Sequence, residues 1–166
     1  MLEFKSATTN DIEQIQQLAS QVWEYTYGKI LEPDQLKYMF DKMYSITSLQ
    51  KQLEVDHHHY FIISENETPY GYLSIEKVNE HFFIFQKVYV IPSAHGKGVG
   101  RFMIEQGCKY LKENYSCPVT IELFVNRHNP AYEFYQHMGF YKYGSRDEPI
   151  GNDYYMNDYI MRMELQ

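Results

Sequence analysis

Residues 82–101 read FFIFQKVYVIPSAHGKGVGR, and this stretch decides the fold. Its first half, Phe82 to Ile91, is an apolar run of the kind that forms a buried strand. Its second half, His95 to Arg101, is a turn with glycine at alternate positions, and a helix that we expect to reach about Tyr115 follows. Such a turn leaves backbone N–H groups open to close approach, and the positive dipole end of the next helix points to the same place. The stretch therefore predicts a main-chain site for an anion such as a diphosphate.

The spacing of the glycines excludes two familiar diphosphate sites. A P-loop needs a Ser or Thr directly after Gly-Lys, and neither follows Lys97. A dinucleotide-binding fold needs Gly-x-Gly-x-x-Gly after the first strand of its βαβ unit. Here Gly100 is one residue too close to Gly98, and several elements precede the turn. We therefore expect neither a P-loop nucleotide nor a nicotinamide dinucleotide at this turn.

The rest of the chain has helical and strand patterns in an order typical of a mixed α/β protein. Apolar residues at helical spacing come first, then a hairpin pattern, then the strand–helix–strand–helix–strand order that starts at Phe82. The other predicted helices lie at residues 12–22, 34–43, 48–53 and 130–137, and the other predicted strands at 60–63, 70–78, 119–126, 140–143 and 154–165, with a loop containing Gly144, Pro149 and Gly151 between the last two. Since no linker or repeat interrupts this order, we expect one α/β domain over residues 1–166.

Charge and hydropathy exclude several classes of partner. The chain has 15 Lys and Arg against 22 Asp and Glu, which gives a formal net charge of −7. Nucleic-acid binders display a basic face, and a bilayer span needs roughly 20 apolar residues in a row, so neither partner is expected. The N-terminus has no secretion-signal pattern, and we therefore expect a cytoplasmic protein. An acidic surface attracts cationic small molecules, and a homodimer is left open.

Neither the cysteines nor the histidine tract predicts a metal site. Cys108 and Cys117 have no metal or redox spacing. His57, His58 and His59 are successive residues, which point to alternate sides of an extended chain and cannot hold one ion together. We therefore expect no metal.

Two segments together resemble the GNAT superfamily of acyl-CoA-dependent N-acetyltransferases. The family writes Gln/Arg-x-x-Gly-x-Gly/Ala between a strand and a helix, and this chain has HGKGVG at residues 95–100 after the family-like strand Lys87–Pro92. Downstream, VNRHNPAYEFYQHMGF at residues 125–140 is similar to the family's pattern of Asn, Ala, Phe/Leu-Tyr and Gly-Phe. Over the whole chain, the resemblance implies a central, mostly antiparallel twisted sheet with a splayed pair of parallel strands and flanking helices.

The resemblance also implies a place for acetyl-CoA as co-substrate. It would lie in a V-shaped opening between residues 85–91 and 119–126, with its pantetheine arm beside the main chain of Val88, Tyr89 and Val90 like an added strand. The diphosphate would lie on the amides of His95, Gly96, Lys97, Gly98, Val99, Gly100 and Arg101. Two positions depart from the family: His95 stands where Gln or Arg is preferred, and one residue instead of two separates Asn129 from Ala131. The family's Asn position therefore stays open between Asn126, His128 and Asn129.

The same resemblance implies the catalytic acid. Tyr135 occupies the family's general-acid position, and a phenol with a reference pKa near 10 is protonated at neutral pH and able to donate to a thiolate. The family often has a Glu in the strand before the glycine turn, but Phe85 and Gln86 stand there. Glu76 and Glu122 are the candidate bases on neighbouring strands, and neither is assigned.

The acceptor is expected to be a primary amine, delivered neutral for direct attack on the thioester. The segments 25–45 and 151–161 are similar to those of bacterial polyamine and diamine acetyltransferases. Asp147, Glu148, Asp153 and Asp158 add negative charge there, which a small cationic amine would require. Two alternatives remain: acetylation of a protein or peptide amine, and a catalytically silent acyl-CoA-binding module.

Overall fold

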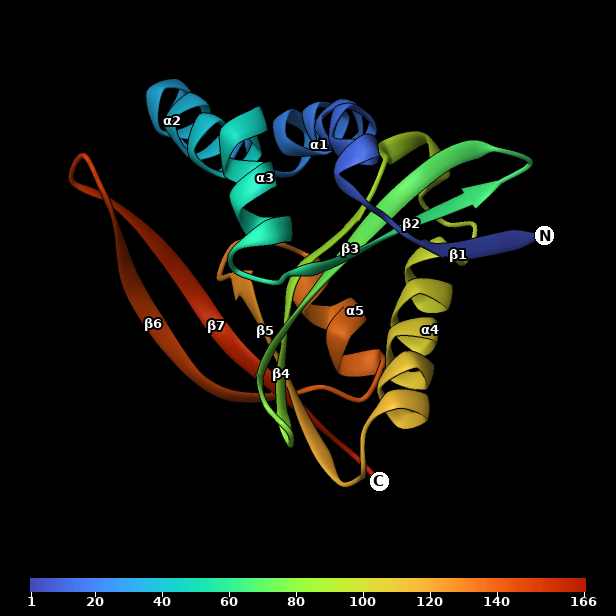
Figure 1. The fold of residues 1–166 in the computed structure, drawn as a ribbon. Coiled ribbons are helices and arrows are strands. Elements are labelled where there is room, and N and C mark those ends of the chain that lie inside the picture. Colours follow the sequence, from blue (N-terminus) through green and yellow to red (C-terminus); the bar gives the residue numbers. More distant parts are fainter.

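The computed structural model describes residues 1–166 and is built on one sheet of seven strands, in the order β1-β2-β3-β4-β5-β7-β6 (Figure 1). The β4–β5 pair is parallel and every other pair is antiparallel. Two short 3₁₀ turns, Thr9–Asp11 and Pro92–Ala94, accompany five α-helices. The elements are β1 (Leu2–Ser6), α1 (Ile12–Tyr27), α2 (Pro33–Tyr44), α3 (Ile46–Glu54), β2 (His59–Glu65), β3 (Thr68–Asn79), β4 (Phe82–Val90), α4 (Val99–Asn114), β5 (Val119–Asn126), α5 (Ala131–His137), β6 (Tyr141–Gly151) and β7 (Tyr154–Leu165).

The helices begin where local side chains satisfy or remove backbone N–H groups. Before α1, Thr8 and Asp11 form a capping box, in which the Thr8 N–H donates to Asp11 Oδ2 at 2.8 Å. Pro33 lies in the first turn of α2, where its missing N–H costs nothing. The predicted helices over these segments are confirmed. None of the helices combines the length and the apolar composition that a bilayer crossing needs.

The parallel strands β4 and β5 pair over only three residues. Their register is Phe82 with Thr120, Phe83 with Ile121 and Ile84 with Glu122, and it ends there. A bulge follows in β4, because Phe85 pairs with Ile75 of β3 while Lys87 already pairs with the adjacent Ser74. A bulge bends its strand and increases the local twist, so β4 leaves β5 beyond this point. The predicted splayed parallel pair is thus confirmed.

Helices cover both faces of the sheet (Figure 1). On one face α4 packs so closely that a Cβ at Gly107 would be 2.9 Å from Leu73 and 3.0 Å from Phe85. On the other face Trp23 of α1 packs against Tyr89 of β4, with ring centroids 6.4 Å apart. The long β6–β7 hairpin extends toward α2 in Figure 1. The two helical layers therefore enclose the point where β4 and β5 separate.

Two strand predictions need correction. The short edge strand β1 was not predicted, because five residues with one paired neighbour carry little hydrophobic alternation. The expected loop around Gly144 and Pro149 is instead most of β6, which is paired with β7, and the turn is only Asn152 and Asp153. As an edge strand, β6 tolerates Pro149, and bulges beside Gly144 and Gly151 take up the irregular residues.

Candidate active site

The glycine-rich turn has the geometry of an anion cradle. Gly96 and Gly98 have φ angles of 77° and 78°, and a Cβ built on either would meet nothing within 4 Å. Gly98 is the N-cap of α4 and no side chain caps this helix start. The first N–H groups of α4 therefore face open space beside a turn without side chains, which fits a diphosphate oxygen.

The His95 side chain and the absence of a side chain at Gly100 have structural roles in the turn. His95 Nε2 donates to the Val90 carbonyl oxygen at 2.9 Å, so this side chain holds the turn against the end of β4. A Cβ at Gly100 would be 3.2 Å from the Phe134 ring, so Gly100 lets α5 approach α4. Only the main chain of these residues is left for an anion. Lys97 and Arg101 are exposed, and Arg101 Nε donates to Glu105 at 2.9 Å.

One edge of β4 is unpaired beside this cradle. Val88, Tyr89 and Val90 pair with β3 on their other edge, in register with Leu73, Tyr72 and Gly71. Toward β5 the last pair is Ile84 with Glu122. An extended ligand with amide groups fits such an edge as an added strand.

Tyr135 lies on α5, and two aromatic rings contact its own edge-on. The ring centroids of Phe134 and Phe140 are 5.4 and 5.9 Å away, and Tyr135 is 7% exposed. Burial raises the pKa of the Tyr135 phenol well above its usual range, and the neighbouring Tyr89 adds to the rise. The phenol therefore stays protonated at neutral pH and can act as a proton donor.

The three candidates for the Asn position lie on the loop from β5 to α5. The Oδ1 atom of Asn126 accepts from the His128 N–H at 2.9 Å, and that of Asn129 accepts from the Ala131 N–H at 2.9 Å. Both carboxamide oxygens thus hold the loop, which leaves the NH₂ groups to donate to a ligand. Asn126 is buried and His128 is exposed.

The candidate bases are both engaged in polar contacts. Glu76 contacts His58 Nε2 at 3.3 Å and accepts from Gln86 Nε2 at 3.0 Å. Glu122 accepts from Arg162 Nε at 2.8 Å. Each carboxylate therefore has a structural partner, and neither is assigned as the base.

The side chains of two tyrosines, to which the sequence assigned no role, meet beside the open edge of β4. The hydroxyls of Tyr27 and Tyr89 are 2.9 Å apart, and Tyr27 reaches this point from the last turn of α1. The main chain of Tyr89 was predicted to bind the cofactor, but its side chain was not, and Tyr27 was not predicted as a site residue. The only sequence signal was its four-residue spacing from Trp23, which places both on one helix face.

A buried lysine lies on the same face of the sheet. Lys87 Nζ donates to Gln52 Oε1 at 2.9 Å and lies 5.6 and 5.5 Å from the ring centroids of Tyr44 and Tyr60. Burial lowers the pKa of Lys87 to about 8, although Glu76 opposes this shift.

The acidic residues of the β6–β7 hairpin are less available than their sequence suggests. Asp147 pairs with Arg127 at 2.9 Å, and Glu148 and Asp158 pair with Arg146 at 3.6 and 3.2 Å. Two arginines thus offset half of the negative charge that was expected there, because pairing of the strands brings them beside these carboxylates.

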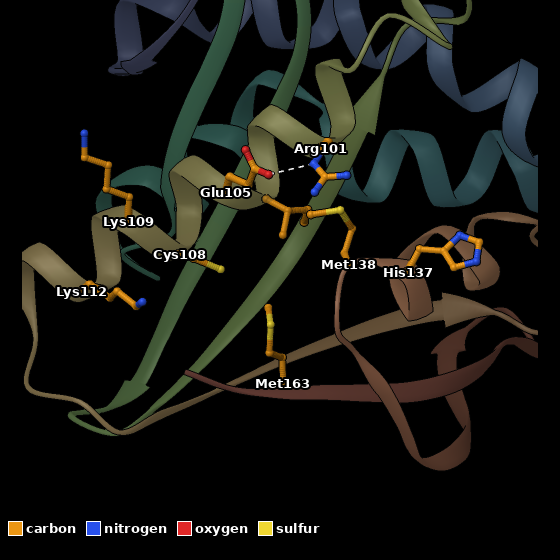
Figure 2. Close-up of a pocket in the computed structure, with 9 residues that line it drawn as sticks. Arg101, Glu105, Cys108, Lys109, Lys112, His137, Met138 and Met163 are labelled. Carbon is orange, nitrogen blue, oxygen red and sulfur yellow. Dashed lines mark hydrogen bonds and ion pairs between the residues drawn. The ribbon is translucent and has the colours of Figure 1, made fainter. Parts of the chain in front are cut away.

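A pocket of about 480 Å³ lies between α4, the end of α5 and β7 (Figure 2). Cys108, Met138 and Met163 line it together with basic residues of α4, and none of its lining residues belongs to β4 or β5. Burial raises the pKa of the Cys108 thiol to about 11, so this thiol is not a nucleophile at neutral pH. The pocket shares Arg101 with the predicted cofactor residues and therefore lies beside the glycine-rich turn.

Comparison with known proteins agrees with this geometry. The model of the acetyltransferase (GNAT) family matches residues 12–140. Among solved structures, the PaiA N-acetyltransferase from Thermoplasma acidophilum, in complex with coenzyme A, is similar with a TM-score of 0.80 at 19% identity over 99% of both chains. The ribosomal-protein-S18-alanine N-acetyltransferase from Escherichia coli has a TM-score of 0.74 at 17% identity, over 100% of this chain and 95% of that one. The spermidine/spermine N-acetyltransferase SpeG from Vibrio cholerae has a TM-score of 0.68 at 18% identity, over 99% of this chain and 92% of that one.

Proposed function

This chain belongs to the acetyltransferase (GNAT) family, and on that premise we propose that it transfers the acetyl group of acetyl-CoA to the primary amine of a small cationic molecule. One observation carries the proposal. Beyond its last pair with β5, the edge of β4 is unpaired and leads into the open glycine turn, and Tyr89 of this edge adds to the raised pKa of the buried Tyr135. Direct transfer from a thioester needs a binding edge, a diphosphate site and a proton donor at one place.

The residues around the opening fit acetyl-CoA. The space beside Gly96 and Gly98 fits the diphosphate, and the free edge of β4 at Val88 and Val90 fits the amides of the pantetheine arm. When bound, the co-substrate supplies an activated acetyl thioester. The main chain of this protein then has two tasks, which are to hold the thioester in register and to keep water from it.

Tyr135 is the proposed general acid. Its hydroxyl donates a proton to the departing sulfur, so the thiol leaves instead of the thiolate. The raised pKa keeps the donor protonated through the whole physiological range. The edge-on rings of Phe134 and Phe140 fix its orientation.

A small acceptor is favoured over a protein by the position of the last hairpin. Tyr38 of α2 donates to the Ile150 carbonyl at 3.0 Å, and Gln35 donates to the Tyr155 carbonyl at 3.2 Å. These contacts tie the β6–β7 hairpin to α2 on the face of the sheet that α1 and α2 cover. We call this face the acceptor side, because segments 25–45 and 151–161, which resemble polyamine acetyltransferases, lie there. A peptide would need an open groove there. SpeG, a spermidine/spermine N-acetyltransferase, has a similar fold, and this similarity of fold also favours a small acceptor.

The test is an acceptor panel with thiol release as the readout. The purified protein, with acetyl-CoA, is offered alkylamines, diamines, polyamines and peptides with free N-termini or lysines. We expect release of free CoA with one or more small alkylamines and little with peptides. Release with peptides alone would replace the small acceptor by a protein amine, and binding of acetyl-CoA without release for any amine would make the protein a silent binding module.

A further inference from the structure

Asp158 of β7 is a buried carboxylate that the reaction described so far does not use. It is 1% exposed, and it pairs with Arg146 of the neighbouring strand β6. Arg146 Nε and Nη2 both donate to the same oxygen, Oδ2, at 3.2 Å. The other oxygen, Oδ1, takes no part in this ion pair.

The alternation of β7 places Asp158 on the acceptor side of the sheet. Tyr154, four residues earlier, packs on Tyr38 of α2 with ring centroids 5.5 Å apart, and even-numbered residues of a regular strand share one face. Met163, an odd-numbered residue, lines the pocket with α4 and α5 on the opposite face. Asp158 therefore points to the side of α1 and α2.

Its position along the strand places Asp158 at the opening. Asp158 pairs with Asn126 at the end of β5, four residues beyond the last pair between β4 and β5. Its charge also acts on the Tyr27–Tyr89 pair. Burial is the largest cause of the raised pKa of both tyrosines, and the Asp158 carboxylate adds to the rise after the effect of each tyrosine on the other.

The charges that face Asp158 leave room for one more cation. Arg146 and Glu148 face it from β6 and Arg127 from the loop after β5, while Tyr27 and Tyr89 face it from α1 and β4. Arg127 also pairs with Asp147. Two guanidinium groups thus meet three carboxylates, and the cluster retains one negative charge.

We propose that Asp158 binds the ammonium group of the acceptor and takes the proton that the nitrogen must lose before it attacks. This rests on the proposed acetyl transfer. A proton passes from the ammonium nitrogen to Oδ1, the nitrogen lone pair forms the N–C bond, and the C–S bond breaks as Tyr135 protonates the sulfur. The attacking nitrogen returns a second proton to the Tyr135 phenolate, and Asp158 releases its proton to solvent. One ammonium and one thioester thus give one amide, one thiol and one proton.

This arrangement explains why the strand before the glycine turn needs no carboxylate. The acid comes from α5, on the face of the sheet that α4 covers, and the base comes from β7, on the face toward α1 and α2. The reacting carbon would lie between them, in the opening of the sheet. Burial raises the pKa of Asp158 while Arg146 opposes the rise, so this carboxylate is more basic than an exposed aspartate.

The test compares pH profiles of kcat/KM for Asp158→Asn and the parent protein, with 1,4-diaminobutane or whichever alkylamine of the panel is acetylated fastest. In the parent, an ionised Asp158 binds the abundant ammonium form, so kcat/KM should be level between about pH 7 and 9. In Asp158→Asn only the free amine can react. Its kcat/KM should fall by about 10²–10⁴-fold at neutral pH and then rise about tenfold per pH unit toward the amine pKa near 10.

Two further variants separate catalysis from structure. Glu113→Gln removes a carboxylate of α4 that is 61% exposed and lies outside this cluster, and it should leave the level profile unchanged. Arg146→Gln should move the acid limb of the profile to higher pH, because Arg146 lowers the pKa of Asp158. This variant also serves as the test if Asp158→Asn does not fold.

The outcomes distinguish this inference from the function on which it depends. If the parent protein acetylates no amine, the proposed function fails. If the parent is active and the profile of folded Asp158→Asn runs parallel to it, Asp158 is only the partner of Arg146 and the inference is overturned. An unmoved acid limb in Arg146→Gln would overturn it equally. Affinity for acetyl-CoA should stay within about threefold in all three variants, because none of the three residues is a predicted cofactor contact.

Discussion

Replacement of Tyr135 by Phe removes the proposed acid and little else. The change keeps the ring and its contacts with Phe134 and Phe140, and burial and the charge of Tyr89 are the only causes of the raised Tyr135 pKa, with no hydrogen bond among them. The free energy of unfolding should therefore change by less than about 1 kcal/mol, the net worth of one hydrogen bond. Turnover should fall by about 10²–10⁴-fold, equivalent to roughly 3–5 kcal/mol of transition-state stabilisation.

The assay is thiol release at saturating amine, measured against acetyl-CoA concentration and pH. The KM for acetyl-CoA should move much less than kcat, since the lost contact matures only in the transition state. A general acid is active only while protonated, so activity in the parent falls as the pH rises through the Tyr135 pKa. Because burial raises that pKa above 10, the fall belongs at strongly alkaline pH, and Tyr135→Phe should lack it. Turnover within a few-fold of the parent in a folded variant that binds acetyl-CoA would refute the assignment.

Three other substitutions test separate parts of the structure. Gly98→Val places a branched side chain at φ 78° in the open cradle, so the rise in melting temperature that acetyl-CoA causes in the parent should disappear; an equal rise would contradict the cradle. Gly107→Ala should lower the free energy of unfolding by about 1–3 kcal/mol, because its Cβ would lie 2.9 Å from Leu73. Denaturant unfolding measures this, and an unchanged free energy would show that α4 and the sheet have room for the methyl group. Lys87 has a pKa lowered to about 8 in the folded state, so the unfolded chain binds more protons above that pH, and stability should rise between about pH 8 and 9.5. Lys87→Met should remove that rise, and an identical pH dependence in both proteins would show that the lysine is charged when folded.

The sequence predicted the parts of the fold that depend on local pattern. The apolar run from Phe82, the glycine turn and the amphipathic helix after it are local signals, and each became the expected element. The edge strands β1 and β6 were missed or shortened because an edge strand needs only one partner and tolerates Pro149. Whether such a segment forms a strand depends on its pairing with a strand that is distant in the sequence.

The site was predictable only where its groups belong to continuous motifs. The main chain of residues 95–101 and Tyr135 lie in two such segments. Tyr27 does not, because it meets Tyr89 through tertiary packing from the end of α1. The sequence named Asp158 for its negative charge alone, and its position beside Asn126 of β5 depends on the pairing of β7. The pairing of Arg127 and Arg146 with the acidic hairpin was invisible for the same reason, because the partners are 12–20 residues apart along the chain and meet only when the strands pair.

A single-turnover reaction with acetyl-CoA labelled with ¹³C in its acetyl group tests the central claim most directly. Equimolar protein, labelled acetyl-CoA and the best amine of the panel are mixed, and mass spectrometry follows the amine and the intact protein together. The account predicts that the label appears on the amine nitrogen in step with free CoA, while the protein never gains an acetyl group. Label that remains on CoA in the presence of every amine, or that passes first to the protein, would contradict direct transfer at this site.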